Sequence, residues 1–416
     1  MVSVKARLSA IISVLSVFAL FTSGRDLSSA YERWGRADLV SHLAAANLML
    51  SRGMSDVRFE RGAAASALAL DPAQMGANLQ DIAARRRTVD GGLPQGLAIL
   101  AADSVGRDAP EARELAERYA AWQRTRVEVD ANLTKPVGAR DPALPKRLAD
   151  EAGALTAAAE ALVGAMENQI RRRDAGLSNL LRVRELTWAA RTFAGNAHLI
   201  VNDALAQKRV LTAKETLDFH VLDREAAFAF GIAQKIVESL SGMEPLKRAV
   251  LGARDGYFQG PFQARTRALL PALADLSLPR PTLAESRGQS TPALSSIMTV
   301  ALTAVTELDG AASGIAAEAR RDVMVQGIVM ALALVLGLGG MVWVVRGVSR
   351  PIERMTSAMQ RLADGDTASE IPYGERRDEI GAMSGAVQVF RQNLVRTREL
   401  EAETALARAS AEEQRK

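Results

Sequence analysis

The chain has 416 residues, with 52 Lys and Arg against 48 Asp and Glu, and no cysteine. Its length allows two or three domains, and the lack of cysteine excludes a disulfide framework and a Cys-ligated metal. The basic residues are dispersed and do not interleave with aromatic residues, which argues against a nucleic-acid partner. Ala and Leu dominate the apolar residues and aromatic residues make up only 4%, so we expect an all-α protein.

The first predicted element is an uncharged segment at residues 8–24, "LSAIISVLSVFALFTSG", which follows Lys5 and Arg7. A cleaved signal peptide would need small residues at its cleavage site, and "FTSGRD" matches that pattern poorly. The sequence after it also continues as helix. We therefore interpret residues 8–24 as a first transmembrane helix behind a cytoplasmic stretch at 1–7, with a cleaved signal peptide as the alternative.

Residues 25–322 are predicted to form a sensor domain of long helices, as one or two bundles, because their apolar spacing is helical. Thr212 followed by Glu215 predicts a capping box at the start of one helix. The last helix, near residues 294–319, should run without a stop into the second membrane segment. Pro and Gly predict helix breaks near residues 71–72, 91–94, 106–110, 136–145, 173–176, 210–212, 242–245, 260–261 and 271–292.

Three arginine motifs in this region are candidate ligand contacts, because the guanidinium fork donates paired hydrogen bonds to small oxyanions. The alternative for each is a solvated helix face with ion pairs. Glycines at 62 and 195 suggest close approach of helices at these motifs. The motifs are Arg58 and Arg61 around Glu60, Arg85 to Arg87 ahead of Asp90, and Arg191 with Trp188, Gly195 and Asn196.

The segments "ERGAAASALAL" and "LQDIAARRRTVDGGL" resemble the start of nitrate- and nitrite-sensing, all-helical sensor domains. The segments "WAARTFAGNAHLIVNDAL" and "VLTAKETLDFHVLDREAAFAFGI" resemble outer domains of alphaproteobacterial chemoreceptors. These resemblances imply a site for a small anion or organic acid. Arg61 is the position that they support best, and Arg58 and Arg191 are weaker candidates.

The second uncharged segment is "VMVQGIVMALALVLGLGGMVWVV" at residues 323–345. Its 23 residues would span roughly 34 Å as a helix, enough for a hydrocarbon core of about 30 Å. Arg346, Arg350 and Arg354 follow it, and Lys5 and Arg7 precede the first segment. The positive-inside rule then predicts cytoplasmic termini, a periplasmic sensor domain and residence in the inner membrane.

Residues 346–396 carry two heptad patterns joined by a connector. Pro351 lies at the first turn of the first helix and Gly365 closes it. Ile371 lies in the connector, Asp378 is a candidate N-cap, and Glu379 suits the helix dipole. The expected packing positions are Ile352, Met355, Met359 and Leu362 in the first helix and Ile380, Met383, Val387 and Phe390 in the second.

This pattern, with the element "DEIG" from Asp378 to Gly381, resembles the HAMP linker. The resemblance implies a parallel four-helix coiled coil formed by a homodimer, which can switch between two packings. Residues 397–416 should extend the coiled coil. The exit "VQVFRQNLVRTRELEAE" resembles that of methyl-accepting chemotaxis proteins, which implies a chemotaxis kinase or adaptor as partner through an output domain outside this sequence.

We therefore expect a transmembrane receptor that senses a periplasmic small molecule and relays the signal through HAMP. No catalytic or metal-binding constellation and no nucleotide loop is found, so neither an enzyme nor a cofactor is expected. Two alternatives remain open. One is the sensor region of a histidine kinase or diguanylate cyclase that lacks its output domain, and the other is a non-signalling membrane stalk.

Overall fold

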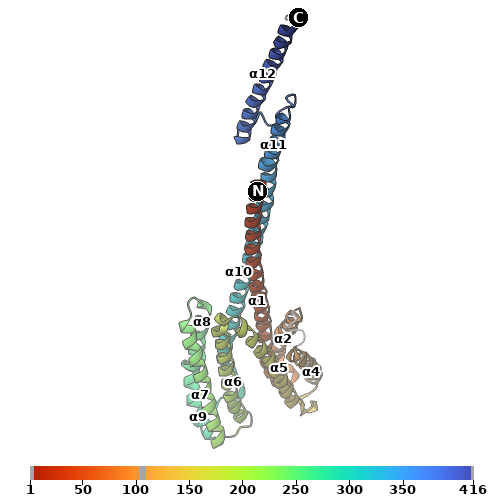
Figure 1. The fold of residues 1–416 in the computed structure, drawn as a ribbon. Helices are drawn as coiled ribbons and strands as arrows, with labels where there is room; N and C mark the ends of the chain where they lie inside the picture. Colours follow the sequence, from red (N-terminus) through yellow and green to blue (C-terminus); the bar gives the residue numbers. More distant parts are fainter. Residues whose placement is uncertain (1–3, 103–108, 414–416) are drawn as a thin grey trace. The chain divides into compact units, whose positions relative to one another are not determined.

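The computed structural model describes residues 4–102 and 109–413, which form helices joined by short connections, with no β-strand among them. This confirms the all-α prediction (Figure 1). The elements are α1 (Val4–Leu68), η1 (Pro72–Gln74), α2 (Gly76–Ala102), α4 (Pro110–Leu133), η2 (Val137–Ala139), α5 (Leu144–Arg173), η3 (Ala175–Leu177), α6 (Ser178–Ala206), α7 (Ala213–Ser239), α8 (Glu244–Ala253), η4 (Arg254–Phe258), α9 (Pro261–Ala274), α10 (Leu283–Val344), η5 (Val345–Ser349), α11 (Arg350–Ala363) and α12 (Glu379–Glu413).

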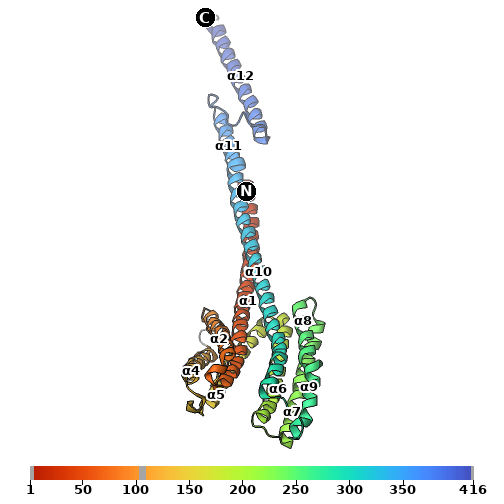
Figure 2. The same ribbon diagram turned by 180° about the vertical axis from the view of Figure 1, so that it is seen from behind.

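The chain divides into two compact units. The larger unit is Glu32–Arg320, and it contains one extensive hydrophobic core to which α1, α2, α4 to α8 and α10 contribute. Figures 1 and 2 both show α2, α4 and α5 in one group and α6 to α9 in another. A smaller core at the end of α6 brings Val201 and Leu205 together with Phe219 of α7 and Leu273 of α9.

Helix α2 runs without interruption through residues 91–94, so the break predicted there is wrong. Gly92 of this stretch and Gly53 of α1 allow tight packing of α2 against α1. A Cβ on Gly92 would lie 2.6 Å from the carbonyl oxygen of Met49, and one on Gly53 would lie 2.9 Å from Leu93 Cγ. Pro94 lies inside the helix. Tertiary packing therefore outweighs the local helix-breaking tendency of these residues.

The helix break predicted across residues 271–292 is confined to residues 275–282. Helix α9 ends at Ala274 and α10 begins at Leu283, so Pro271 and Pro292 lie inside helices. Ile297, one turn beyond Pro292, is completely buried, and such burial offsets the cost of a proline in a helix. Of the break near residues 106–110, residues 106–108 lie outside the described residues.

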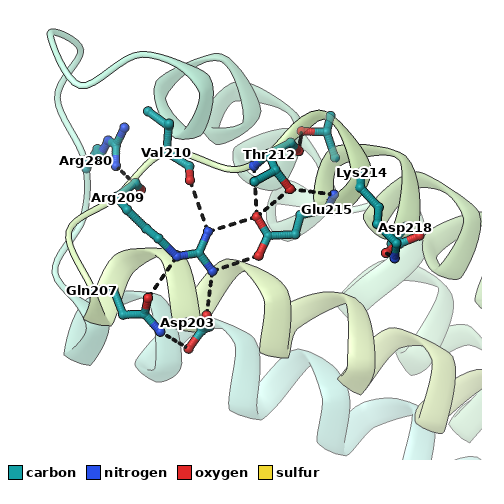
Figure 3. Close-up of polar contacts among 10 residues, drawn as sticks. Asp203, Gln207, Arg209, Val210, Thr212, Lys214, Glu215, Asp218 and Arg280 are labelled. Carbon is teal, nitrogen blue, oxygen red and sulfur yellow. Dashed lines mark hydrogen bonds and ion pairs between the residues drawn. The ribbon is translucent and has the colours of Figure 1, made fainter.

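The capping box at the start of α7 is confirmed, and Figure 3 shows it in detail. Thr212 Oγ1 accepts a hydrogen bond from the Glu215 amide at 3.2 Å, and the Glu215 carboxylate accepts one from the Thr212 amide at 2.8 Å. Arg209 bridges Glu215 and Asp203 at 2.7 and 2.6 Å. Arg280 donates to the Arg209 carbonyl at 2.8 Å and so ties the segment before α10 to the end of α6.

The second unit comprises Met1–Tyr31 and Arg321–Lys416. Both predicted membrane segments lie in helices that are long and apolar enough to cross a membrane. Large apolar side chains such as Phe18, Phe21 and Leu336 are more than half exposed on them, which suits lipid and not water. A Cβ on Gly337 would lie 3.0 Å from Ser16 Oγ, so the two segments pack closely.

Candidate functional site

A cavity of about 750 Å³ lies inside the larger unit, lined by residues of α1, α2, α5, α6 and α10. The structure brings the three predicted contacts together at this cavity, Arg58 and Arg61 from α1 and Arg191 from α6. A fourth arginine, Arg287 of α10, joins them. Residues separated by more than 200 positions in the sequence therefore surround one space.

Arg58 is held on one side of the cavity by a carboxylate. It forms an ion pair with Glu160 at 3.1 Å and donates to Thr192 Oγ1 at 3.2 Å. Trp188 Nε1 also donates to Glu160, at 2.7 Å. The Arg58 guanidinium carbon lies 5.5 Å from the Trp188 ring centroid, a cation–π distance. The position of Arg58 is therefore fixed by the protein itself.

The other three arginines lack such a partner. Among the described residues, no carboxylate lies within 4.0 Å of the guanidinium nitrogens of Arg61, Arg191 or Arg287. Arg287 donates to Ser66 Oγ at 2.7 Å. Arg191 is only 8% exposed, and its Nε has no hydrogen-bond partner. Buried donors are nearly always satisfied in folded proteins, so this arrangement leaves room for an external acceptor.

Burial and mutual repulsion lower the pKa values of these guanidinium groups. Burial lowers the pKa of Arg61, and neighbouring Arg58 and Arg287 lower it further. Burial and Arg58 lower the pKa of Arg191 to about 10. Arg191, with a pKa of about 10, therefore keeps its charge at neutral pH. Burial also lowers the pKa of Arg287. Two acids line the cavity, Glu160, which pairs with Arg58, and Asp81, which pairs with Arg85. The four arginines therefore leave an excess of positive charge, which favours a bound anion.

His198 of α6 also lines the cavity, and it is not among the candidate site residues taken from the sequence. It is buried, and burial together with Arg191 lowers its pKa to about 4, so the imidazole is neutral at physiological pH. Its ring centroid lies 5.9 Å from that of Tyr257 and 5.2 Å from that of Phe262. His198 is thus a neutral polar group between the arginines and an aromatic cluster.

Sequence reasoning also missed Arg287, because the predicted break at 271–292 placed it outside a helix. No local signal marked it: the dipeptide Arg-Gly occurs at 61–62 and 287–288, which line the cavity, but also at 52–53 and 346–347, which do not. The expectation of close helix approach at Gly62 is wrong, because no atom lies within 4 Å of a Cβ built there. Gly195 makes room only for the Arg191 side chain of its own helix. These glycines leave space beside the arginines.

The arginines of the motif at Arg85 to Arg87 do not line the cavity. Arg85 pairs with Asp56 and Asp81, and Arg86 pairs with Glu60 and Asp130, while Arg87 is exposed. Glu60 and Asp90 are further bound by Arg126, at 2.6 Å each. At this motif the structure favours the ion-pair alternative.

The predicted HAMP residues form a small core within one chain. Met355 and Leu362 of α11 pack with Ile371 of the connector and Val387 of α12. Ile380 and Pro351 are also buried, and Ile352 is half-buried. By contrast, Met359, Met383 and Phe390 are 50%, 43% and 54% exposed.

Local geometry explains the glycines and the acidic residues of this region. Gly365 has φ +100° and ends α11, where the Asp366 amide donates to the Arg361 carbonyl at 3.0 Å. Asp378 accepts from the Gly381 amide at 3.1 Å and caps α12, with Glu379 in its first turn. A Cβ on Gly381 would collide with the backbone of Arg376, so the first turn of α12 needs glycine there.

The membrane exit is a π-helical turn, η5, and not a break in the helix. Pro351 lacks an amide hydrogen, so the Gly347 carbonyl four residues earlier loses its usual helical donor. The Gly347 carbonyl accepts instead from Arg376 Nη2 at 3.3 Å. Arg376 is also paired with Asp378, and this interaction holds the Asp378 pKa at about 2. One side chain therefore joins the membrane exit to the start of α12.

Comparison with known proteins gives three findings. The HAMP domain family matches residues 343–396. A Sinorhizobium fredii protein described as "Probable chemoreceptor y4sI" is 39% identical over 67 residues, which cover 16% of this chain and 9% of that protein. A solved structure described as "Structure of the NasR transcription antiterminator" aligns over 94% of this chain and 99% of its own, with a TM-score of 0.47 and 16% identity.

The structural similarity is too low to support any argument about this chain. The sequence match spans less than a tenth of the Sinorhizobium protein's length, so it bears on that segment alone. The HAMP match coincides with the region in which α11 and α12 form their own core. With two helices able to cross a membrane, this chain is a HAMP-containing transmembrane receptor that resembles chemotaxis proteins.

Proposed function

We propose that this chain is the input region of a chemoreceptor that binds a small anion in the periplasm. The observation that carries this proposal is a group of three arginines that share one cavity without a carboxylate partner: Arg191, which is buried, and Arg61 and Arg287, which are half-buried. An arginine buried without a partner is unfavourable to folding, and a binding site is the usual reason for keeping it. The region would bind its ligand and not transform it, so we propose no enzymatic activity.

The position of the arginines in the chain suggests how binding could be transmitted. Arg61 belongs to α1 and Arg287 to α10, and the same two helices contain the predicted membrane segments. An anion that draws these arginines together would shift one helix against the other by about an ångström or two, since packed helices move as units. A few kcal/mol of differential contact is enough to change the populations of two states.

The receiving element would be a dimeric HAMP coiled coil on the cytoplasmic side of the inner membrane. Exposure of Met359, Met383 and Phe390 in the single chain supports a homodimer, because these positions continue the heptad seams. The Sinorhizobium relative favours chemotaxis as the output, with a kinase or adaptor as partner. A sensor kinase or cyclase could use the same input. A non-signalling stalk is disfavoured, because it would have no need for the unpaired arginines.

Binding can be tested on the full chain in lipid nanodiscs. We would measure thermal unfolding with acetate, nitrate, sulfate and succinate, and we expect at least one of these anions to raise the midpoint by several degrees. Arg61→Ala should abolish that rise. Arg87→Ala is the matched control, because it removes an exposed arginine of the same unit and should leave the rise intact. If no anion stabilises the protein, or if both variants respond alike, the proposed site is wrong.

A further inference from the structure

A second cavity of about 290 Å³ lies next to the arginine-lined cavity. Its wall includes residues of α6, α9 and α10, and His198 and Ser290 line both cavities. The remaining wall is mainly apolar. Its apolar residues are Val201, Phe262, Ala268, Leu269, Leu270, Leu273 and Pro281, and its polar residues are Arg265, Thr266, Ser286 and Gln289.

His198, which lines both cavities, is suited to lie between a charged and an apolar part of one ligand. His198 is neutral because burial and Arg191 lower its pKa to about 4. Within the described residues, its imidazole nitrogens have no hydrogen-bond partner. A neutral ring that packs against Phe262 and Tyr257 is compatible with an apolar group beside it, and its free N–H can donate to an anion on the other side.

Volume separates two classes of anion. An inorganic oxyanion has four or five heavy atoms and would fill a small part of a space of about 750 Å³. Cavities of roughly 300–1,000 Å³ are typical of sites for organic ligands with apolar bodies. Four arginines line the first cavity, whereas the second cavity is mainly apolar and has one arginine, Arg265, in its wall. The two cavities together thus have the polarity of an amphiphilic acid.

We propose that the ligand is an organic carboxylate whose charged end lies at Arg61, Arg191 and Arg287 and whose apolar body extends past His198 into the cavity at Leu269 and Phe262. This inference rests on the proposed function and narrows its ligand class. Burial of methylene groups in the second cavity then makes affinity rise with the length of the hydrocarbon chain. An inorganic anion or acetate can use only the first cavity.

The test is isothermal titration of the full chain in nanodiscs with nitrate, acetate, butyrate, hexanoate and benzoate, with empty nanodiscs as the blank. We expect hexanoate or benzoate to bind at least tenfold more tightly than acetate. Leu269→Trp fills the second cavity, and it should lower the affinities of hexanoate and benzoate to that of acetate. Leu251→Trp, at an exposed position of α8 that lines neither cavity, should change nothing.

The outcomes separate this inference from the proposed function. If nitrate or acetate binds in an Arg61-dependent way and longer acids bind no more tightly, the inference is overturned and the anion site stands. If longer acids bind more tightly but Leu269→Trp has no effect, the assigned path is wrong. If no anion binds at all, both proposals fall. The chain-length series on the unaltered protein decides the matter even if Leu269→Trp does not fold.

Discussion

The larger unit contains two groups of arginines, one around Glu60 and one that includes the next residue of α1, Arg61. The first group is paired with carboxylates and the second is not. Glu60 is 1% exposed and lies between Arg86 and Arg126, at 3.0 and 2.6 Å. Arg61, the next residue, faces the cavity and has no carboxylate within 4.0 Å among the described residues. The first group is closed by the protein's own charges, and the second is left open.

The difference teaches that residue type alone does not distinguish structure from site. Both groups consist of arginines on long helices, and both contain guanidinium groups largely removed from water. Pairing distinguishes them, because a buried charge with a partner supports the fold while a buried charge without one weakens it. The predictions below test whether pairing is the right criterion.

The largest effect on the free energy of unfolding is expected from removing one of the arginines paired with Glu60. Arg126→Met leaves Glu60 buried with Arg86 as its remaining partner, and loss of one member of a buried ion pair costs about 3–5 kcal/mol. Denaturant unfolding of the full chain in detergent measures this change. Arg118→Met is the control, because Arg118 pairs with Glu114 on the surface and its loss should have little effect on the free energy of unfolding. Equal effects of the two variants would contradict the assignment.

His198, which lines the same cavity as the unpaired arginines, should make the stability of the protein depend on pH. Its pKa is about 4 in the folded protein and about 6.5 in an unfolded chain, so the unfolded state binds more protons between these values. Stability therefore falls as pH decreases from 6.5 to 4, by up to about 3 kcal/mol. The comparison of unfolding free energies between the wild type and His198→Gln across this range isolates the effect. A constant difference between the two proteins would show that His198 does not titrate as described.

A smaller effect, on anion affinity, should follow from removing a negative charge at the edge of the cavity. Glu160 is the acid that pairs with Arg58 at its edge. Glu160→Gln removes one negative charge, keeps a hydrogen-bond acceptor for Trp188, and should tighten acetate binding several-fold through reduced repulsion. Titration calorimetry measures the change. Glu185→Gln, at an exposed pair with Arg171, is the control, and a similar gain there would point to a general charge effect.

The smallest effect is expected for stability in the absence of ligand. Arg61→Ala removes a charge that is repelled by Arg58 and Arg287, so the free energy of unfolding should stay the same or rise by about 0.5 kcal/mol. The same denaturant experiment used for Arg126 provides the comparison. A loss above about 2 kcal/mol would place Arg61 among the structural arginines.

Features that depend on neighbouring residues could be read from the sequence. The capping box at Thr212, the glycine that ends α11 and the N-cap at Asp378 are each decided within a few positions. The membrane segments follow from composition over about 20 residues.

Features that depend on distant contacts could not be read in this way. Glu60 and Arg126 are 66 positions apart, and nothing local shows that they pair. The helix breaks expected at residues 91–94 and at Pro292 were prevented by packing against other helices. The same reason hid Arg287 and His198, whose roles depend on which helices surround the cavity.

The central claim is that an anion at the open arginines changes the packing of HAMP across the membrane. The chain has no cysteine, so a single cysteine at Met383 gives an unambiguous disulfide between two copies. We predict that Met383→Cys crosslinks in membranes, that the rate changes at least twofold with the tightest-binding anion, and that Arg61→Ala abolishes this change. Absence of crosslinks, or a rate that is the same with and without the anion, would contradict the claim.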